Sequence, residues 1–382
     1  MIYLDNAATS WPKPAKVYES MDRFMRKIGA NPGRGGHSFS VESGRLVLRT
    51  REKLSKLINA YDSRQVIFTL NATDSLNMTI KGLVKDGDHV VTTKMEHNSM
   101  IRPINRLAQN GIEVDVLECD ETGVLDLDEL KGKLRPNTRL VAVNHASNVL
   151  GTIQPLDEIG KIVKDHDYSK LLVDAAQTIG IIPIDVVDSE IDFLAFPGHK
   201  GLMGPQGTGG LYIRPGEILN FWREGGTGSK SESILHPEEL PDRLESGTPN
   251  TPGIAGLEAG LEYLMDKGIE NILNKKQKLT EELIEGLLRI DHVQVYGPLD
   301  SKKISPVVSF NIGGENSQEI SFILDQAFGV ASRGGLHCAP MVHENLGTLD
   351  QGAVRFSIGD FNNQEEIETA ISAVKKIAEE KD

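Results

Sequence analysis

The chain has little cysteine, because only Cys119 and Cys338 occur among its 382 residues. Two cysteines cannot build a disulfide framework, and in a reducing compartment they remain free thiols. Long apolar runs are also missing, since none approaches the roughly 18 residues that span a bilayer. Residues 1–14 lack the basic and apolar regions of a signal peptide. We therefore expect a cytoplasmic protein with no membrane partner.

Positive charge is also scarce, since 41 Lys and Arg face 55 Asp and Glu and leave a net charge of −14. Binding a nucleic-acid backbone requires a positive surface, so we expect no nucleic-acid partner. A local pocket for one small phosphate stays compatible with this balance. The content of 39% hydrophobic and 25% charged residues is ordinary for a soluble globular chain that buries a sizeable core. The length favours two or three domains.

The first two thirds of the chain alternate short β-rich runs with helical patterns. We expect buried strands at residues 65–69, 89–93, 112–117, 139–144, 170–174 and 192–196. Such alternation is typical of an α/β fold with a mostly parallel sheet between helices.

Several residues, most of them polar, fall just past the ends of these strands. They are Asn71, Ala72, Thr73, Glu96, His97, Asn148, Asp174, His199 and Lys200. Ligands of parallel sheets bind at the carboxyl ends of the strands. We therefore expect the functional site at this edge of the sheet.

The last third has a different pattern. Residues 225–251 form a polar loop, and Thr251 is expected to cap a helix that continues to about residue 288 with an interruption at Gly268. Apolar runs at 306–310 and 353–358 follow, and Asn363 with Glu366 forms a capping box before a final helix. We expect an arm at residues 1–15 that packs on the small domain, a large domain at 16–255, and a small α+β domain at 256–382.

Lys200 lies at the end of an expected strand, directly after Gly198 and His199 and before a glycine-rich loop. A lysine in this position suits covalent chemistry with an aldehyde. Asp174 could pair with a protonated pyridine nitrogen and Gln177 could donate to a phenolic oxygen, although Asp174 could also simply cap a helix. Together these residues indicate a lysine that holds pyridoxal phosphate.

Other residues could complete such a site. Ala72 and Thr73 begin a helix and could bind a phosphate, or Asn71 could serve only as a helix cap. His97 could stack on a flat cofactor or be an ordinary loop histidine. Arg355 could clamp a substrate carboxylate, although a surface salt bridge is the commoner use of an arginine.

Cys338 lies in a loop flanked by glycines, where Arg333 and His337 are close enough in sequence to favour a thiolate. A small buried hydrophobe is the alternative role for such a cysteine. A metal site formed by His337, Cys338 and His343 lacks the usual spacing of paired ligands, so we expect no metal. Cys119 is expected to be structural.

Several motifs occur in one order along nearly the whole chain. They are YLDNAATS at 3–10, NPGRGGHS at 31–38, EHNS at 96–99, HASNVLGT at 145–152, VDAAQ at 173–177, PGHKGLMGPQGTGGLY at 197–212 and ESGTPNT at 245–251. In these motifs the chain resembles the class V aminotransferase family of fold-type I pyridoxal-phosphate enzymes. Within that family it is most similar to the cysteine desulfurases.

The resemblance implies a fold-type I enzyme with a seven-stranded type of sheet, a smaller C-terminal domain and a homodimer with shared active sites. For the cofactor ring, it implies Lys200 as the Schiff-base lysine, Asp174 on the pyridine nitrogen, Gln177 on the phenolic oxygen and His97 stacked on the ring. For the phosphate, it implies Ala72, Thr73 and His199, together with Thr248 from the second subunit. The substrate carboxylate would be held by Asn148 and Arg355. The implied reaction converts L-cysteine to L-alanine and leaves the sulfur on Cys338 as a persulfide.

The segment RGGLHCA at 333–339 is similar to the R-x-G-H-H-C-A pattern of group II desulfurases. Two residues depart from the family: Leu336 replaces a histidine, and Pro197 replaces a hydroxyl residue that usually touches the phosphate. A selenocysteine lyase, another aminotransferase or epimerase, and a catalytically silent scaffold are the alternative functions. The sequence does not identify the sulfur-acceptor protein or the pathway, for which iron–sulfur assembly is one candidate.

Overall fold

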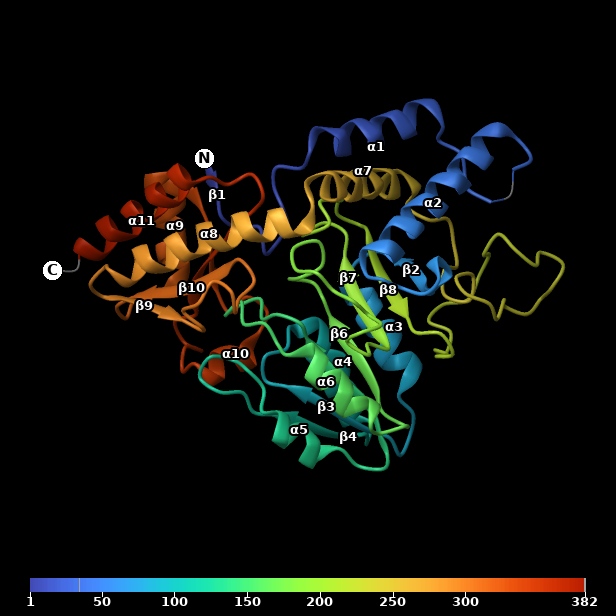
Figure 1. Ribbon diagram of the computed structural model, residues 1–382, viewed down its shortest axis with the longest axis horizontal. Coiled ribbons are helices and arrows are strands. Elements are labelled where there is room, and N and C mark those ends of the chain that lie inside the picture. Colours follow the sequence, from blue (N-terminus) through green and yellow to red (C-terminus); the bar gives the residue numbers. More distant parts are fainter. Residues whose placement is uncertain (34, 381–382) are drawn as a thin grey trace.

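The structure is a computed structural model that describes residues 1–33 and 35–380. Figure 1 shows a large sheet on one side of the molecule and a smaller sheet on the other. The long helix α8 (Ile269–Leu288) runs from the first part to the second.

Seven strands of the described chain form the large sheet, in the order β2-β8-β7-β6-β5-β3-β4. Their bounds are β2 Val66–Thr69, β3 His89–Thr93, β4 Glu113–Leu117, β5 Thr138–Asn144, β6 Lys170–Asp174, β7 Phe193–Pro197 and β8 Gly209–Ile213. The five strands from β3 to β7 are parallel, whereas β8 is antiparallel to both of its neighbours. This confirms the expected α/β class with a mostly parallel sheet.

Strand β8 was not expected, because its first residues belong to the glycine-rich loop after Lys200. Close packing between strands requires glycine at this position. A Cβ on Gly210 would stand 2.4 Å from the ring of Phe196 on the neighbouring strand β7. A residue type that disfavours strands is therefore required here by close packing.

Helices cover both faces of this sheet. Their bounds are α1 Ala15–Lys27, α2 Ser38–Leu57, α3 Ala72–Leu83, α4 Asn98–Gln109, α5 Leu127–Lys133, α6 Leu156–Lys164 and α7 Thr251–Lys267. Successive residues of β5 face opposite cores: Val141 and Val143 pack with α2, α6 and α7, whereas Leu140 and Ala142 pack with α3 and α4. Because both faces of these strands are buried, their sequences are continuous apolar runs and do not alternate with polar residues.

The smaller sheet has the order β12-β13-β10-β9 among the described residues. Its strands are β9 Val293–Tyr296, β10 Val307–Ile312, β12 Arg333–Gly335 and β13 Ala353–Ser357, and the helices around it are α8, α9 Ser317–Phe328, α10 Pro340–Asn345 and α11 Gln364–Glu379. The expected capping box at the start of α11 is confirmed, since Asn363 and Glu366 bond to each other's backbone N–H groups.

The first ten residues run between the two sheets. Strand β1 (Ile2–Tyr3) pairs in parallel with β11 (Val330–Ala331), and the Leu4 side chain lies fully buried in the core of the small sheet. Farther along, the Ser10 backbone N–H donates to the carbonyl of His199 at 3.2 Å. Residues 1–10 thus contact both parts of the protein.

Helix α7 begins one residue earlier than expected. Asn250, and not Thr251, is the N-cap, because its side chain accepts a hydrogen bond from the N–H of Gly253 at 3.1 Å. The interruption at Gly268 is confirmed: its φ of 79° ends α7, and α8 starts at the next residue.

The apolar face of α7 packs into the core of the large sheet through Leu257, Leu261 and Leu264. A boundary at residue 255 would cut through this helix. We therefore propose that the large domain extends to Gly268 and that the small domain begins with α8.

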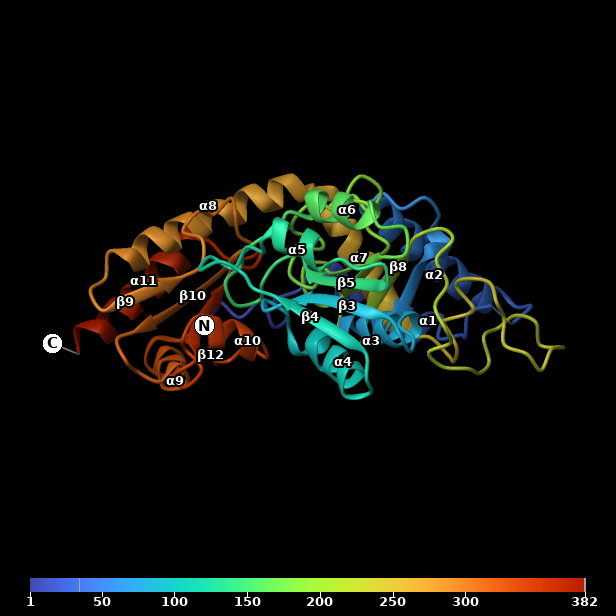
Figure 2. The ribbon, with the colours of Figure 1, turned by 90° about the horizontal axis from the view of Figure 1, so that it is seen from below.

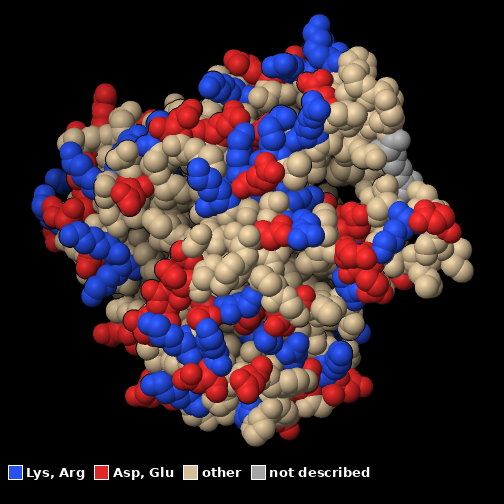
Figure 3. All heavy atoms as spheres, turned by 45° about the vertical axis from the view of Figure 1, so that its right-hand side comes forward, with Lys and Arg blue, Asp and Glu red and all other residues tan. Residues whose placement is uncertain are grey.

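The loop expected at residues 225–251 starts earlier and spans residues 214–250, since no helix or strand occurs in this stretch of the described chain. Part of the loop projects from the edge of the molecule in Figures 1 and 2. On the face shown in Figure 3, charged side chains of both signs are interspersed. Within residues 1–33 and 35–380, no helix combines the length and the apolar character that a membrane crossing requires.

The position of Leu4 generates a stability prediction. Leu4→Ala removes a fully buried side chain from the small-sheet core and should lower the free energy of unfolding by about 2–5 kcal/mol. Urea denaturation measures this change. The control Leu70→Ala, at a half-exposed side chain, should change stability by less than about 1 kcal/mol. Equal effects of the two substitutions would contradict the anchoring of the N-terminal residues.

Candidate active site

Lys200 follows strand β7 and lines a cavity of about 180 Å³ at the carboxyl edge of the large sheet. Two glycines allow its loop to pack closely: a Cβ on Gly198 would stand 2.1 Å from Thr208 Oγ1, and one on Gly201 would stand 2.1 Å from the carbonyl oxygen of Ile179. Burial lowers the pKa of Lys200 to about 8. The uncharged fraction of its amine at neutral pH is therefore much larger than that of a solvated lysine, and the uncharged amine can attack a carbonyl carbon.

Asp174 ends strand β6 and lines the same cavity. Its Oδ1 accepts a hydrogen bond from the N–H of Ala176 at 2.9 Å. Burial raises the pKa of Asp174, and the positive charge of Lys200 acts in the opposite direction. A cation placed against this carboxylate would offset the cost of its burial.

Gln177 lies one turn beyond Asp174 and also faces the cavity. Its Nε2 donates to the carbonyl of Ala7 at 3.2 Å, so the N-terminal residues help to fix its side chain.

The N-terminus of helix α3 forms another wall of the cavity. Asn71 caps this helix by accepting from the N–H of Asp74, whereas the N–H groups of Ala72 and Thr73 have no acceptor within the described chain. Thr73 Oγ1 lies 2.9 Å from Ser99 Oγ. Two free N–H groups and a hydroxyl at a helix N-terminus suit an anion such as a phosphate.

Two histidines border the cavity, and both are held in the neutral form. Burial lowers the pKa of His97 and of His199 to about 4. His97 caps helix α4 by accepting from the N–H of Ser99, and His199 Nδ1 lies 3.1 Å from Thr9 Oγ1. Both rings therefore act as hydrogen-bonding and packing groups in this state.

One cavity thus collects most of the residues that the sequence assigned to the cofactor. Its lining is Asn71, Ala72, Thr73, His97, Ser99, Asn144, Ala146, Asn148, Asp174, Ala176, Gln177, Pro197, His199 and Lys200. Thr248 is not among these residues, since it lies exposed in the 214–250 loop.

Arg355, on strand β13, is 1% exposed, so the alternative of a surface salt bridge is wrong. Its guanidinium bonds to the N-terminal residues on one side and to the loop of Asn148 on the other. Nη2 lies 2.7 Å from the carboxylate of Asp5, and Nη1 donates to the carbonyl of Asn148 at 3.1 Å. Arg355 Nε and Asn148 Oδ1 are buried and have no hydrogen-bond partner within the described chain. A bound carboxylate and a bound amine could satisfy such groups.

Cys338 is exposed, in contrast to the alternative of a buried hydrophobe. Its φ is 58° and that of His337 is 50°, in the left-handed region that costs about 1–2 kcal/mol per non-glycine residue. Two contacts hold this strained loop beside the cavity: Asn148 Nδ2 donates to the carbonyl of His337, and the N–H of Asn98 donates to that of Cys338. Strain of this kind persists where the surroundings over-determine the backbone.

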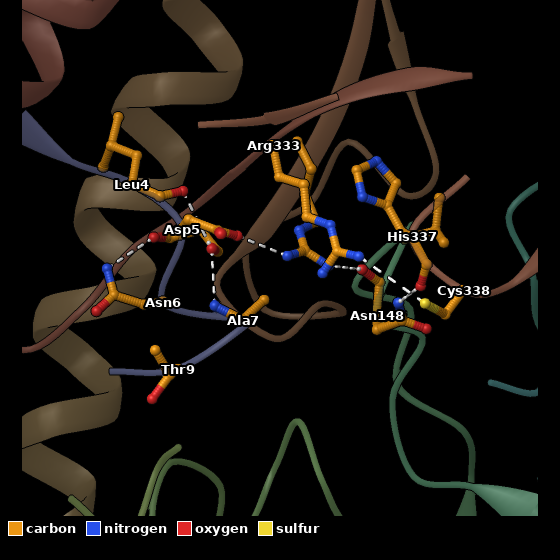
Figure 4. Close-up of polar contacts among 12 residues, drawn as sticks. Leu4, Asp5, Asn6, Ala7, Thr9, Asn148, Arg333, His337 and Cys338 are labelled. Carbon is orange, nitrogen blue, oxygen red and sulfur yellow. Dashed lines mark hydrogen bonds and ion pairs between the residues drawn. The ribbon is translucent and has the colours of Figure 1, made fainter. Parts of the chain in front are cut away.

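A guanidinium lies next to the thiol, since Arg333 Nη2 is 3.8 Å from Cys338 Sγ (Figure 4). Arg333 stands directly opposite Arg355 across strands β12 and β13. Arg355 is paired with Asp5, whereas Arg333 has no ion pair within the described chain. The Arg333 guanidinium is therefore available to an anionic group beside the sulfur.

The expectation that His337 also favours the thiolate is wrong. Its ring is 3% exposed, and Nε2 lies 2.9 Å from the carbonyl of Ala353. Burial lowers the pKa of His337 to about 2, so the ring carries no positive charge that could stabilise a thiolate. Its role is structural.

The remaining cysteine and the two departures from the family pattern also have defined places. Cys119 packs partly buried against the core, and burial raises its pKa to about 12, which keeps it an inert thiol. Leu336 is partly exposed beside Cys338, and Pro197 lines the cavity.

In the described ranges, no three His, Cys, Asp or Glu side chains form a group that could hold a metal ion.

Sequence reasoning gave no role to three residues that the structure places in the site. Asp5 pairs with Arg355, Asn144 lines the cavity, and Glu96 lies completely buried beneath it. Asp5 belongs to the YLDNAATS motif, Asn144 ends strand β5, and Glu96 follows strand β3. None of these positions by itself indicates the residue that the side chain contacts.

Comparison with known proteins identifies the family. The family model described as "Aminotransferase class-V" matches residues 2–369. A probable cysteine desulfurase of Methanothermobacter thermautotrophicus is 39% identical over 384 residues, which cover 99% of this chain and 94% of that protein. A cysteine desulfurase of Escherichia coli is 34% identical and covers 99% and 93% of the two chains.

Solved structures agree with the sequence comparison. The apo structure of the cysteine desulfurase from Thermococcus onnurineus NA1 matches with a TM-score of 0.94 at 38% identity, covering 99% of this chain and 95% of that one. The fold, the order of motifs and these relatives lead to one conclusion: the chain belongs to the class V aminotransferase family.

Proposed function

We propose that this protein is a pyridoxal-phosphate-dependent cysteine desulfurase, which converts L-cysteine to L-alanine and takes the sulfur onto Cys338 as a persulfide. One observation carries the proposal. An exposed thiol on a strained loop lies 3.8 Å from a guanidinium, and hydrogen bonds hold that loop against the cavity that contains Lys200.

The residues around the cavity fit pyridoxal phosphate. The free N–H groups of Ala72 and Thr73 would hold the phosphate together with His199, and Asp174 would hold a proton on the ring nitrogen. His97 would stack on the ring and Gln177 would donate to its phenolic oxygen. When bound, the cofactor withdraws electrons from the α-carbon of the substrate.

The chain's own residues position the substrate and move its proton. Arg355, whose Nε is unpaired, would hold the carboxylate of L-cysteine. Asn148 was expected on the carboxylate too, but its Nδ2 already donates to His337, so its unpaired Oδ1 would accept from the amine instead. Lys200 Nζ would take the proton from the α-carbon and later return it, which suits an amine whose pKa is about 8.

Cys338 then performs the sulfur transfer. Its Sγ, as a thiolate beside Arg333, forms an S–S bond with the substrate sulfur while the substrate C–S bond breaks. The electron pair of that bond stays with the three-carbon fragment, which takes up protons and leaves as L-alanine. An exposed persulfide is accessible to the thiol of a sulfur-acceptor protein.

We further propose a cytoplasmic homodimer with shared active sites. Two free cysteines suit a reducing compartment. The 214–250 loop carries Thr248 and also presents Ile234, which is fully exposed, and Leu235, which is 76% exposed. A second copy would cover these apolar side chains and bring Thr248 to the cavity.

The role of Lys200 has a direct test. The purified protein should be yellow, and borohydride reduction should fix the cofactor to Lys200, which mass spectrometry of the peptides detects. Lys200→Ala should abolish the covalent attachment, whereas Lys303→Ala, at an exposed lysine, should retain it. A colourless wild-type protein, or attachment elsewhere, would favour a catalytically silent scaffold.

The role of Cys338 is tested by Cys338→Ser. This variant should keep the bound cofactor and lose sulfide release from L-cysteine by on the order of 10³-fold or more, because the nucleophile is gone. Cys119→Ser is the matched control and should retain activity. A selenol is already ionised near neutral pH, so turnover of selenocysteine should persist in Cys338→Ser. Unchanged turnover of L-cysteine would sink the mechanism.

The dimer proposal predicts an effect of charge in the projecting loop. Replacing both Ile234 and Leu235 with Glu should shift the protein toward the monomer in light scattering coupled to size exclusion, because two carboxylates would be buried at the interface. Leu288→Glu, at a half-exposed end of α8, should leave the dimer intact. A monomeric wild type would refute the shared site.

A further inference from the structure

A second carboxyl group lies buried beneath the cavity. Glu96 follows strand β3 and is 0% exposed. Its Oε1 accepts hydrogen bonds from Thr93 Oγ1 at 2.7 Å and from the N–H of Asn144 at 3.0 Å. These bonds tie the ends of strands β3 and β5 together at the edge where the cavity opens.

The other oxygen of Glu96 is unsatisfied. Oε2 is buried with no hydrogen-bond partner in the described part of the chain, and so is Oδ1 of Asn144. The amide nitrogen of Asn144 donates to the carbonyl of Met95, which directs this side chain toward the same residues. A buried carboxylate oxygen without a donor is costly, and a proton on Glu96 removes the negative charge that this oxygen would otherwise carry unsatisfied.

The surroundings also disfavour a negative charge on Glu96. No lysine, arginine or histidine forms an ion pair with it among residues 1–33 and 35–380. Asp174, whose strand partner is Asn144, faces it from β6, and the inert thiol of Cys119 faces it from the segment after β4. Strands β3 and β5 contribute only the uncharged Thr93 and Asn144.

We propose that Glu96 is a positioning residue held as a neutral carboxylic acid, which fixes Asn144 in the cavity wall and leaves Asp174 as the single anion of the buried pair. Two carboxyl groups in one desolvated site divide the roles, with one keeping the proton and the other the charge. The assignment of the proton is independent of the proposed function. The benefit to the cofactor rests on the proposed function, since an ionised Asp174 is needed to hold a proton on the ring nitrogen of pyridoxal phosphate.

The pH dependence of stability follows from this assignment. Burial raises the pKa of Glu96 from 4.5 to about 8, and the charge of Asp174 adds to that shift. Between these values the folded protein holds a proton that the unfolded chain releases. The stabilising contribution is therefore complete below the unfolded pKa and is lost as the pH rises through about 8.

Infrared spectroscopy of the purified enzyme tests the proton directly. At about pH 6, below the pKa of about 8, wild type should show the carbonyl stretch of a protonated carboxylic acid. Glu96→Gln should lack this band. Glu118→Gln, at a mostly exposed glutamate that pairs with Lys94, should retain it. A wild-type spectrum whose band does not depend on Glu96 would overturn the proposal.

Thermal unfolding gives a second readout. Glutamine copies the neutral acid and cannot lose a proton, so the melting temperature of wild type should fall relative to Glu96→Gln between about pH 5 and pH 8. Parallel curves would show that folding does not raise the pKa of Glu96 and would contradict the proposal.

The positioning role is read from the cofactor. Glu96→Ala removes the bonds to Thr93 and Asn144 and should shift the midpoint of the pH titration of the visible absorbance, and Glu96→Gln should restore that midpoint. Equal midpoints in wild type and Glu96→Ala would refute the role. If no visible absorbance exists, the proposed function fails while the infrared result still decides the proton.

Discussion

The buried ion pair of Arg355 with Asp5 joins three parts of the molecule that are remote in sequence. Arg355 comes from strand β13, Asp5 from the N-terminal residues, and the carbonyl of Asn148 from the large domain. Removing one partner of a buried pair costs about 3–5 kcal/mol, because the other charge stays desolvated. The pair therefore contributes to holding the cavity, the loop of Cys338 and the first ten residues in their relative positions, together with the bonds from Asn148 and Asn98 to that loop.

Burial also sets the charges of the site. It shifts Lys200, His97, His199 and Glu96 toward their neutral forms, since water no longer solvates their ions. Burial also raises the pKa of Asp174, but the N–H of Ala176 and the positive charge of Lys200 lower it and so favour the anion, while the small sheet contributes guanidinium groups. A site with few but well-placed charges can bind a zwitterionic substrate and still provide a neutral amine.

Most of the fold and most residues of the cavity could be predicted from the sequence, because both depend on local patterns. Apolar runs of β-branched residues marked the parallel strands, and polar residues at their ends marked the edge where the ligand binds. Strand β8 was missed because its first two residues are glycines that disfavour strands: Gly210 allows close packing against Phe196 of β7, and Gly209 allows close packing against the backbone of Asn71. The charge state of His337 was also misjudged, since its burial depends on the fold of the whole loop. The partner of Arg355 lies 350 residues away, and no local pattern could identify it.

The central claim is that Cys338 accepts the substrate sulfur. Mass spectrometry of the peptide that contains Cys338, after brief incubation of the enzyme with L-cysteine and without reductant, measures this most directly. The account predicts the mass of one added sulfur atom on Cys338, which a reductant removes, and none on Cys119. An unmodified Cys338 in an enzyme that still forms alanine would contradict it.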